Sequence, residues 1–243
     1  MRRSIRPTRL LAPTLLLAFT GCFKLSRETP ALQQYVLSGA SPASAATGAA
    51  TGAATGAVNT AARDRTGLTI GLRRLNLASY LAVPAIVVRR GDNRIVTSEF
   101  HRWGEDLDAG MNRAVASYLA GLPPVRAVEV APWPARVRQD FIVQLHVARF
   151  EGVVDSAATE GRVHLLAGWD IIRPTSGAVL VRGNTDERGG SWRAGDYAGL
   201  VKGLDIALAR LARDISACLA RFPNDSTPPA SCGPAAGPEG IQR

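Results

Sequence analysis

The sequence predicts an α+β fold in which a mixed, mostly antiparallel sheet packs against two amphipathic helices as a two- or three-layer sandwich. The first observation is a pair of segments, beginning at Leu107 and Tyr197, whose apolar residues recur every three or four positions. The second is a set of short stretches in which apolar and polar residues alternate, as in strands with one buried face. Helices segregated from runs of strands are typical of this class.

The first expected strands precede the first helix. A short strand is expected at 33–38, and residues 68–75 alternate like a strand. Two further strands, at 85–90 and 94–100, are joined by Gly91-Asp92-Asn93. A tight turn fits there because Gly and Asn tolerate positive φ angles.

The first helix is expected to begin at Leu107, where Asp106 can cap its free N–H groups. Its apolar stripe consists of Leu107, Met111, Val115, Tyr118 or Leu119, and Leu122. Pro123-Pro124 ends it, because proline lacks an N–H and clashes with the preceding turn. A strand at 125–130 follows.

The later strands form a predicted antiparallel meander, followed by the second helix. Alternation marks strands at 141–147 and 163–171, and a third begins at 179–182. The second helix carries the longest apolar stripe: Tyr197, Leu200, Leu204, Leu208, Leu211, Ile215, and Cys218 or Leu219.

The N-terminus is typical of an export signal. Arginines at positions 2, 3, 6 and 9 precede the apolar stretch 10–19, and Thr20-Gly21-Cys22 follows. Phe19-Thr20-Gly21-Cys22 looks like a bacterial lipobox, which predicts lipid attachment at Cys22 and a stable membrane anchor. Position 23 is Phe rather than Asp, so the outer membrane is the expected location.

Composition divides the chain into five parts. Residues 39–66 contain three Ala-Thr-Gly-Ala units, and such a tract buries too little apolar surface to offset its ordering entropy. The expected parts are a signal peptide at 1–21, a lipidated N-terminus with the first strand at 22–38, a flexible insert at 39–66, the folded domain at 67–222 and a disordered tail at 223–243.

The charge balance gives no sign of nucleic-acid binding. Four of the 29 basic residues precede Cys22, so the chain from there on carries 25 basic against 20 acidic residues. This mild surplus is spread along the sequence rather than gathered into a Lys/Arg block. Contact with anionic lipid head groups is compatible with it.

Two cysteines remain beyond the lipobox. The bacterial periplasm is oxidising, so Cys218 and Cys232 could pair and join the tail to the last helix, closing a loop of about 15 residues. The alternative is a buried Cys218 and a free Cys232 in the tail.

No arrangement of residues predicts catalysis or a metal site. The histidines are His101, His146 and His164, and no ligand spacing accompanies them, so solvent-facing side chains are favoured. The serines lack the Gly-x-Ser-x-Gly context of a nucleophile elbow. Asp170 and Asp186 are spaced as turn and strand-edge residues rather than as paired carboxylates. We therefore expect no enzyme activity, no metal and no cofactor.

The block at 80–107 resembles a known family. Tyr80-Leu81-x-x-Pro84-x-Ile86-Val87, Asn93-Arg94 and Glu99-Phe100-His101-Arg102-Trp103-Gly104-Glu105-Asp106-Leu107 are similar to the ABC-type transport auxiliary lipoproteins, of the paraquat-inducible (Pqi) type that accompanies MCE lipid-transport systems. Trp169-Asp170 and the helix from Asp196-Tyr197 fit as well. This chain departs from the family at Ala82-Val83, where charged residues are usual, and in its insert.

The resemblance implies a non-catalytic accessory lipoprotein at the outer membrane, facing the periplasm. Its implied partners are an MCE-domain periplasmic protein and ABC transporter subunits, which together move lipids between membranes. The resemblance leaves open whether the chain also forms a homo-oligomer. One alternative is an envelope scaffold or assembly lipoprotein that binds protein or peptidoglycan without lipid transport. Another is a lipid-carrying module with its own cavity.

The junction between the strand at 94–100 and the first helix allows two interpretations. In one, Trp103 packs beneath the helix while Arg102 pairs with a carboxylate. In the other, Phe100, Arg102 and Trp103 form part of a partner-docking surface, since Trp and Arg are frequent anchors of interfaces.

Overall fold

The structure is a computed structural model of the chain. It describes residues 30–39, 67–134, 136–155, 158–222 and 232. The described residues from Ala31 onward belong to one compact unit. Cys22, the signal peptide, the insert beyond Gly39 and the tail apart from Cys232 lie outside these ranges. The expectations for those segments therefore stay predictions.

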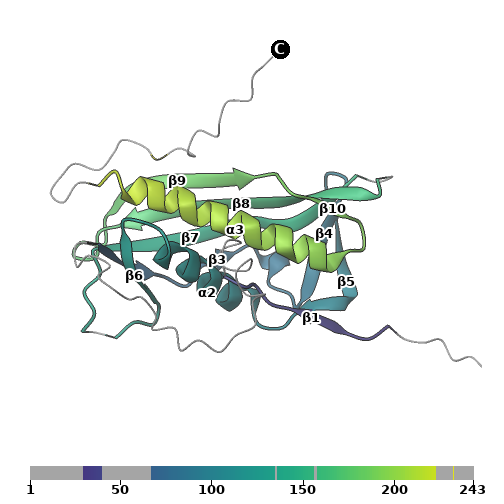
Figure 1. Cartoon of the computed structure of the whole chain (residues 1–243), viewed down its shortest axis with the longest axis horizontal. Helices are drawn as coiled ribbons and strands as arrows, with labels where there is room; N and C mark the ends of the chain where they lie inside the picture. The colour runs from purple at the N-terminus through teal and green to yellow at the C-terminus, as the bar shows by residue number, and fades with distance from the viewer. Residues whose placement is uncertain (1–29, 40–66, 135, 156–157, 223–231, 233–243) are drawn as a thin grey trace, which may run out of the picture. The chain divides into compact units, whose positions relative to one another are not determined.

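Within the described ranges, ten strands form one sheet and two α-helices pack against it (Figure 1). The strands are β1 (Gln33–Tyr35), β2 (Leu68–Leu72), β3 (Asn76–Leu77), β4 (Ala85–Arg90), β5 (Arg94–Trp103), β6 (Val125–Val130), β7 (Phe141–Val154), β8 (Glu160–Ile172), β9 (Val179–Glu187) and β10 (Ser191–Arg193). The helices are α2 (Leu107–Ala120), α3 (Tyr197–Leu219) and a single 3-10 turn, η1 (Ser79–Leu81).

The sheet is organised around the long strand β7. One side of β7 pairs with β8 in an antiparallel ladder that continues to β9 and β10. The other side pairs in parallel with β2, β3 and β4 in succession, and β5 then pairs antiparallel with β4. The longest ladders are antiparallel, which confirms the predicted meander of β7, β8 and β9. The mixed sheet together with the two helices confirms the predicted α+β class.

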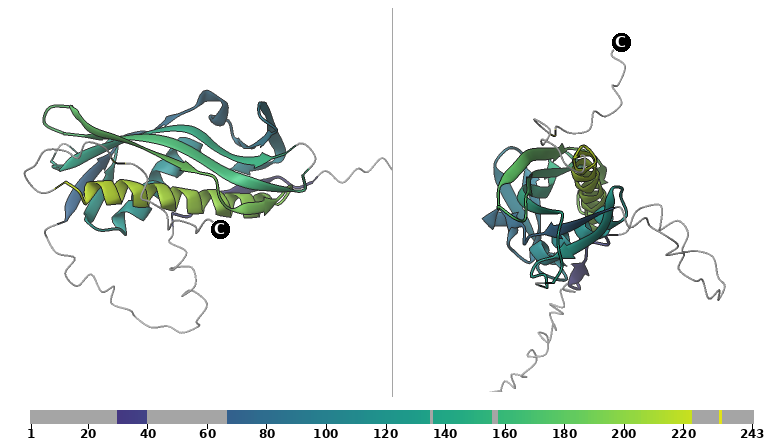
Figure 2. Two further views of the ribbon diagram at one scale, coloured as in Figure 1. Left: turned by 90° about the horizontal axis from the view of Figure 1, so that it is seen from above. Right: turned by 90° about the vertical axis from the view of Figure 1, so that its left-hand side faces the viewer.

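The two helices lie side by side against the sheet. Helix α3 runs along β7 to β10, and α2 packs on α3 and β6, as Figures 1 and 2 show. The buried stripe of α3 includes Leu200, Leu204, Leu208, Leu211 and Ile215, each at 0% exposure. Because this stripe follows the helical period, the sequence predicted it correctly.

Both helices begin at an aspartate, but only one aspartate caps its helix. The Asp196 side chain accepts a hydrogen bond of 2.9 Å from the Gly199 N–H at the start of α3. Asp106 occupies the same position before α2, yet its side chain makes no capping hydrogen bond. The expected cap at Asp106 is therefore wrong in its side-chain contact, although the helix begins where predicted.

The face of β7, β8 and β9 that contacts α3 is the core face. A Cβ at Gly152 would lie 3.0 Å from Leu200, and Thr185 donates a hydrogen bond of 2.7 Å to Asp214 on α3. We call the opposite side of these three strands the rear face. Because side chains alternate along a strand, the rear face carries the polar residues of the meander.

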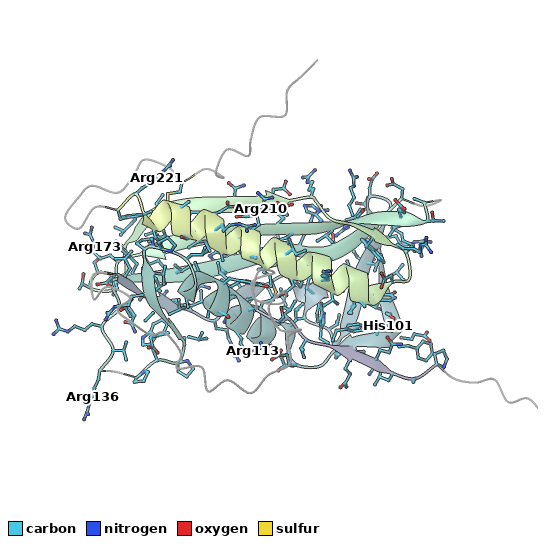
Figure 3. The ribbon with its side chains drawn as sticks, in the orientation of Figure 1. His101, Arg113, Arg136, Arg173, Arg210 and Arg221 are labelled. Carbon is cyan, nitrogen blue, oxygen red and sulfur yellow. A yellow bond between two sulfur atoms is a disulfide. The ribbon has the colours of Figure 1, made fainter. Side chains whose placement is uncertain are left out.

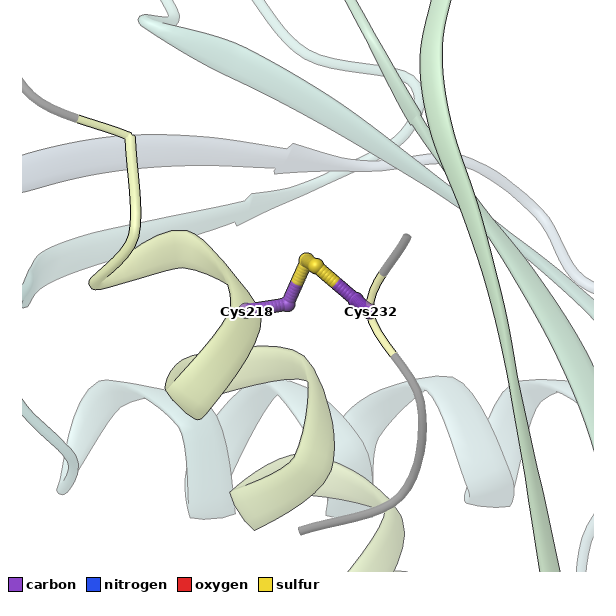
Figure 4. Close-up of a disulfide and its surroundings, with 2 residues drawn as sticks. All are labelled: Cys218 and Cys232. Atoms are coloured by element: carbon purple, nitrogen blue, oxygen red, sulfur yellow. A yellow bond between two sulfur atoms is a disulfide. The ribbon is translucent and has the colours of Figure 1, made fainter. Parts of the chain in front are cut away.

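A disulfide joins the tail to the last helix, as Figure 4 shows. Cys218 on α3 and Cys232 are bonded with their Cα atoms 5.5 Å apart. Cys232 also forms an isolated parallel bridge with Gly183 on β9. Of the two arrangements that the sequence left open, the structure has the paired one. Neither α-helix in the described ranges is long and apolar enough to cross a membrane.

Candidate functional site

The junction between β5 and α2 places Trp103 in the core. The backbone N–H of Trp103 donates to the carbonyl oxygen of Pro84 at 2.7 Å, and that of Gly104 donates to Tyr35 at 2.8 Å. The indole is 7% exposed and stacks against Phe150 with ring centroids 6.0 Å apart. Trp103 is thus a packing residue that fixes β5 to β7.

A shallow groove of about 750 Å³ lies beside this junction. It is lined by Leu75, Asn76, Leu77, Ala82, Val83, Pro84, Trp103, Gly104, Glu105, Asp106, Leu107 and Asp108. Of the residues that carry the family resemblance, Pro84 and the run from Trp103 to Leu107 line this groove. Ala82 and Val83 give this groove an apolar wall.

Two ion pairs hold the acidic rim of the groove. Glu105 pairs with Arg113 of α2, and Arg113 also donates to the Leu37 carbonyl oxygen at 3.1 Å. Asp108 lies 3.4 Å from Arg74. These contacts connect the segment after β1, the start of α2 and the β2–β3 connection, so the rim is a structural support. Figure 3 labels Arg113 beside α2.

Phe100 and Arg102 lie on the other side of β5 from Trp103. Phe100 is half-buried and Arg102 is exposed, in register with Gln34 of β1. Within the described residues Arg102 forms no ion pair, so the expected pairing with a carboxylate is wrong. The structure separates Trp103 from the other two candidates, and a partner contact through Phe100 and Arg102 stays a prediction.

His101 joins three segments in a way that sequence reasoning missed. Its Nδ1 atom lies 3.0 Å from the Tyr35 hydroxyl, and its ring stacks on Tyr197 with centroids 4.1 Å apart. Burial, reinforced by the nearby Asp196 and Tyr197, raises the pKa of Tyr35. His101, labelled in Figure 3, thus packs between β1 and α3 rather than facing solvent freely. No sequence signal placed these rings together, because they come from three distant segments.

Tyr80 belongs to a buried ionic cluster on the rear face. Its hydroxyl donates to Glu151 at 2.9 Å, and Arg89 donates to the same carboxylate through Nε at 2.6 Å. Glu151 is 0% exposed. Burial, together with the Glu151 charge, raises the pKa of Tyr80 to about 12. The sequence analysis did not single out Glu151. The signal that could have indicated it is a carboxylate within an otherwise mostly apolar strand.

The remaining histidines pair with the two aspartates considered from the sequence. His164 is 6% exposed and its Nε2 atom lies 2.9 Å from Asp186, so the expectation of a solvent-facing His164 is wrong. His146 is exposed and lies 3.7 Å from Asp170. Asp170 lies within β8, whereas Asp186 is the penultimate residue of β9, which pairs with β8 alone among the named strands and so lies at an edge of the sheet, as the sequence predicted for Asp186. The hydrogen bonds from Arg188 lower the pKa of Asp186, although burial of the carboxylate acts in the opposite direction.

Among the residues that the structure describes, no three His, Cys, Asp or Glu side chains are grouped so that they could hold a metal ion. The strongest clusters are ion pairs that connect neighbouring strands. The described residues form a continuous sheet with a groove at the β5–α2 junction and an exposed surface on the outer side of β1 and β5.

The chain is therefore an α+β domain with a groove at the β5–α2 junction that residues of the recognisable block line in part. It belongs to the family of ABC-type transport auxiliary lipoprotein components, which matches residues 35–216. A search of the curated proteins found no match.

Solved structures provide a fold comparison. Protein XCC0632 from Xanthomonas campestris is similar with a TM-score of 0.54 at 13% identity, over 62% of this chain and 82% of that chain. An uncharacterized protein gives a TM-score of 0.49 at 16% identity, over 63% and 92% of the two chains. The PelC dodecamer from Paraburkholderia phytofirmans gives 0.38 at 14% identity, over 62% and 86%. The similarity to XCC0632 indicates a shared fold and nothing about function. The two lower TM-scores are too low to support a structural conclusion.

Proposed function

We propose that this protein is a non-catalytic, lipid-anchored accessory of an ABC/MCE-type lipid-transport system, facing the periplasm from the outer membrane. The observation that carries the proposal is the family match over residues 35–216, which follows a lipobox ending at Cys22. A protein of this kind needs an anchor, a rigid domain and a surface for the periplasmic transport component.

The anchor would keep the folded domain close to the membrane. Gln33, the first residue of β1, is eleven residues after Cys22. A fully extended chain spans at most about 3.6 Å per residue, so β1 can lie no more than about 40 Å from an acylated Cys22. The end of the domain that carries β1 would therefore remain near the membrane surface, where a periplasmic partner must approach it.

A surface on β1 and β5 supports the proposed partner contact. In the β1–β5 register Gln34 lies opposite Arg102, and alternation puts Leu32 and Val36 on the same side of β1 as Gln34. Leu32 is 51% exposed and Val36 is 59% exposed. We call Leu32, Val36, Phe100 and Arg102 the β1–β5 surface. Exposed aliphatic side chains and a half-buried aromatic ring beside an arginine are typical of a protein interface.

Site-specific photo-crosslinking tests this assignment in intact cells. A photoreactive amino acid at position 102 is expected to trap the MCE-domain protein, whereas the same probe at position 213 should not. Arg213 is a suitable control because it is exposed on α3, away from the β1–β5 surface. Trapping of only peptidoglycan-bound or assembly proteins at position 102 would favour the envelope-scaffold function instead.

A further inference from the structure

Three arginines from three strands and a fourth from the segment after β9 converge on a cleft at the rear face. The cleft has a volume of about 410 Å³. It is lined by Arg89, Gly91, Asp92, Asn93, Arg149, Val153, Arg162, Val163, His164, Leu166 and Arg188, where Arg188 directly follows β9. No residue of the groove at the β5–α2 junction takes part. The cleft is thus a separate site.

The strand register explains why the arginines meet. Arg89, Val153 and Arg162 form one row across β4, β7 and β8. In the adjoining row, Glu151 of β7 lies opposite His164 of β8. Long guanidinium side chains from neighbouring strands can therefore reach over the same small area of the sheet.

Two of the arginines are held in place by carboxylates. Arg89 donates to Glu151 through Nε at 2.6 Å and through Nη2 at 3.3 Å, and Nη1 donates to the Asp92 carbonyl oxygen. Arg188 donates to both oxygens of Asp186, at 3.0 and 2.8 Å. A guanidinium has five N–H donors, so each of these groups keeps donors that can point into the cleft.

The other two arginines are not committed to a close partner. Arg149 approaches Glu151 only to 3.9 Å and its side chain is 39% exposed. Arg162 is exposed and forms no ion pair with any described residue. The acidic groups facing the cleft are Asp92 together with Glu151 and Asp186, which the held arginines already neutralise. The four arginines thus exceed the three carboxylates by one positive charge, apart from His164.

This combination is suited to one chemical class of ligand. Guanidinium groups bind phosphate oxygens in paired hydrogen bonds, and donors fixed beforehand lose less freedom on binding. Val153 and Leu166 add half-buried apolar groups beside the arginines. We propose that the cleft binds a phosphate group, carried either by inorganic phosphate or by a phospholipid head group. This inference does not depend on the proposed transport role.

Calorimetry on the full chain carrying Cys22→Ser, which lacks only the acylation site, tests the inference. The probes are inorganic phosphate, dihexanoyl phosphatidylglycerol below its micelle concentration, and dihexanoyl glycerol, which lacks the phosphate. Arg149→Gln with Arg162→Gln should weaken binding of a phosphate-bearing probe about tenfold or more, because two charge-assisted contacts are lost. The control is Arg173→Gln with Arg213→Gln, which removes the same charge from the other end of β8 and from α3. It should change the affinity less than about twofold.

Each outcome decides the proposal. Tighter binding of phosphatidylglycerol than of phosphate, lost in the cleft variant alone, assigns the site to a lipid head group. Equal binding of both, again lost only in the cleft variant, assigns it to free phosphate. The proposal is overturned if neither probe binds at millimolar concentration, if dihexanoyl glycerol binds as well as the phospholipid, or if both double variants weaken binding equally. Unchanged thermal unfolding of the variants shows that a loss of binding is not a loss of fold.

Discussion

Gly183 of β9 lies directly opposite Trp169 of β8, and the indole occupies the space that a side chain at position 183 would need. A Cβ at Gly183 would lie 2.1 Å from the Trp169 ring, which is 1% exposed. The register does not shift at this pair, so the glycine marks a close approach rather than the bulge that a glycine within a strand also suggests. The large central residue of the meander therefore depends on the absence of a side chain on the next strand.

Gly183→Ala is expected to lower the free energy of unfolding by about 1–3 kcal/mol, because the added methyl forces the ring or the strand to move. Gly168→Ala is the matched control: it lies on β8, and the nearest atom to its added Cβ is 3.9 Å away. That change should be neutral or stabilise by up to about 1 kcal/mol. Urea unfolding followed by tryptophan fluorescence measures both, and equal effects would contradict the packing described.

Replacing the buried carboxylate of the rear face should be far more costly than replacing a surface one. Glu151 is 0% exposed, and Glu151→Gln leaves Arg89 without its charged partner. We expect this variant to lower the free energy of unfolding by about 3–5 kcal/mol. Glu187→Gln provides the comparison, because Glu187 contacts Arg210 at 3.4 Å with both side chains partly exposed. Its effect should stay below about 1 kcal/mol. Similar losses for the two variants in denaturant unfolding would disprove the role given to Glu151.

The stability of the domain should fall at alkaline pH partly through Tyr80. Its pKa is raised to about 12 in the folded protein, against 10.0 for an ordinary tyrosine. The unfolded chain therefore releases this proton first, so the stabilisation is complete below pH 10 and is lost as the pH rises toward 12. Tyr80→Phe should make the decline in unfolding free energy between these limits less steep. An unchanged pH dependence, or a normal tyrosinate absorbance titration in the wild type, would argue against this assignment.

The disulfide should stabilise the end of α3. Cys218 and Cys232 are 14 residues apart, and closing a loop of about that length restricts the unfolded chain by about 3 kcal/mol. Cys232→Ser should therefore lower the unfolding free energy by about 2–3 kcal/mol. Wild type treated with a reductant should show the same loss, whereas the variant should not respond to it. Detection of two free thiols in the exported, folded protein would show that the bond is absent.

The helices and several strands follow from local periodicity, which is why the strands 85–90 and 125–130 and the start of α3 were predicted at their observed bounds. Strand β7 continues to Val154, well beyond the expected 147. Alternation did not predict this second half because the register shifts between Val147 and Arg149. A shift of one residue reverses the alternation, so Phe150 faces the core although simple counting places it outside. The two-residue β3 and three-residue β10 are too short to give any alternation.

The side-chain clusters were harder to predict than the fold. His164 alternates away from the core row as expected, yet it is 6% exposed and its Nε2 atom lies 2.9 Å from Asp186 on the next strand. Burial of this kind depends on polar side chains from adjacent strands. The sequence of one strand does not show which residues lie beside it in the sheet. Trp103 shows the same limit, because only the position of Phe150 across the sheet decides that it packs in the core.

In the proposed function, a lipid anchor at Cys22 holds this domain beside the transport machinery. The decisive test is crosslinking in intact cells, followed by mass spectrometry of wild type and Cys22→Ser. We predict that acylated wild type captures MCE and ABC transporter subunits and that Cys22→Ser loses both the acylation and the capture. Acylated wild type that captures only unrelated envelope proteins would contradict the transport role and favour an envelope scaffold.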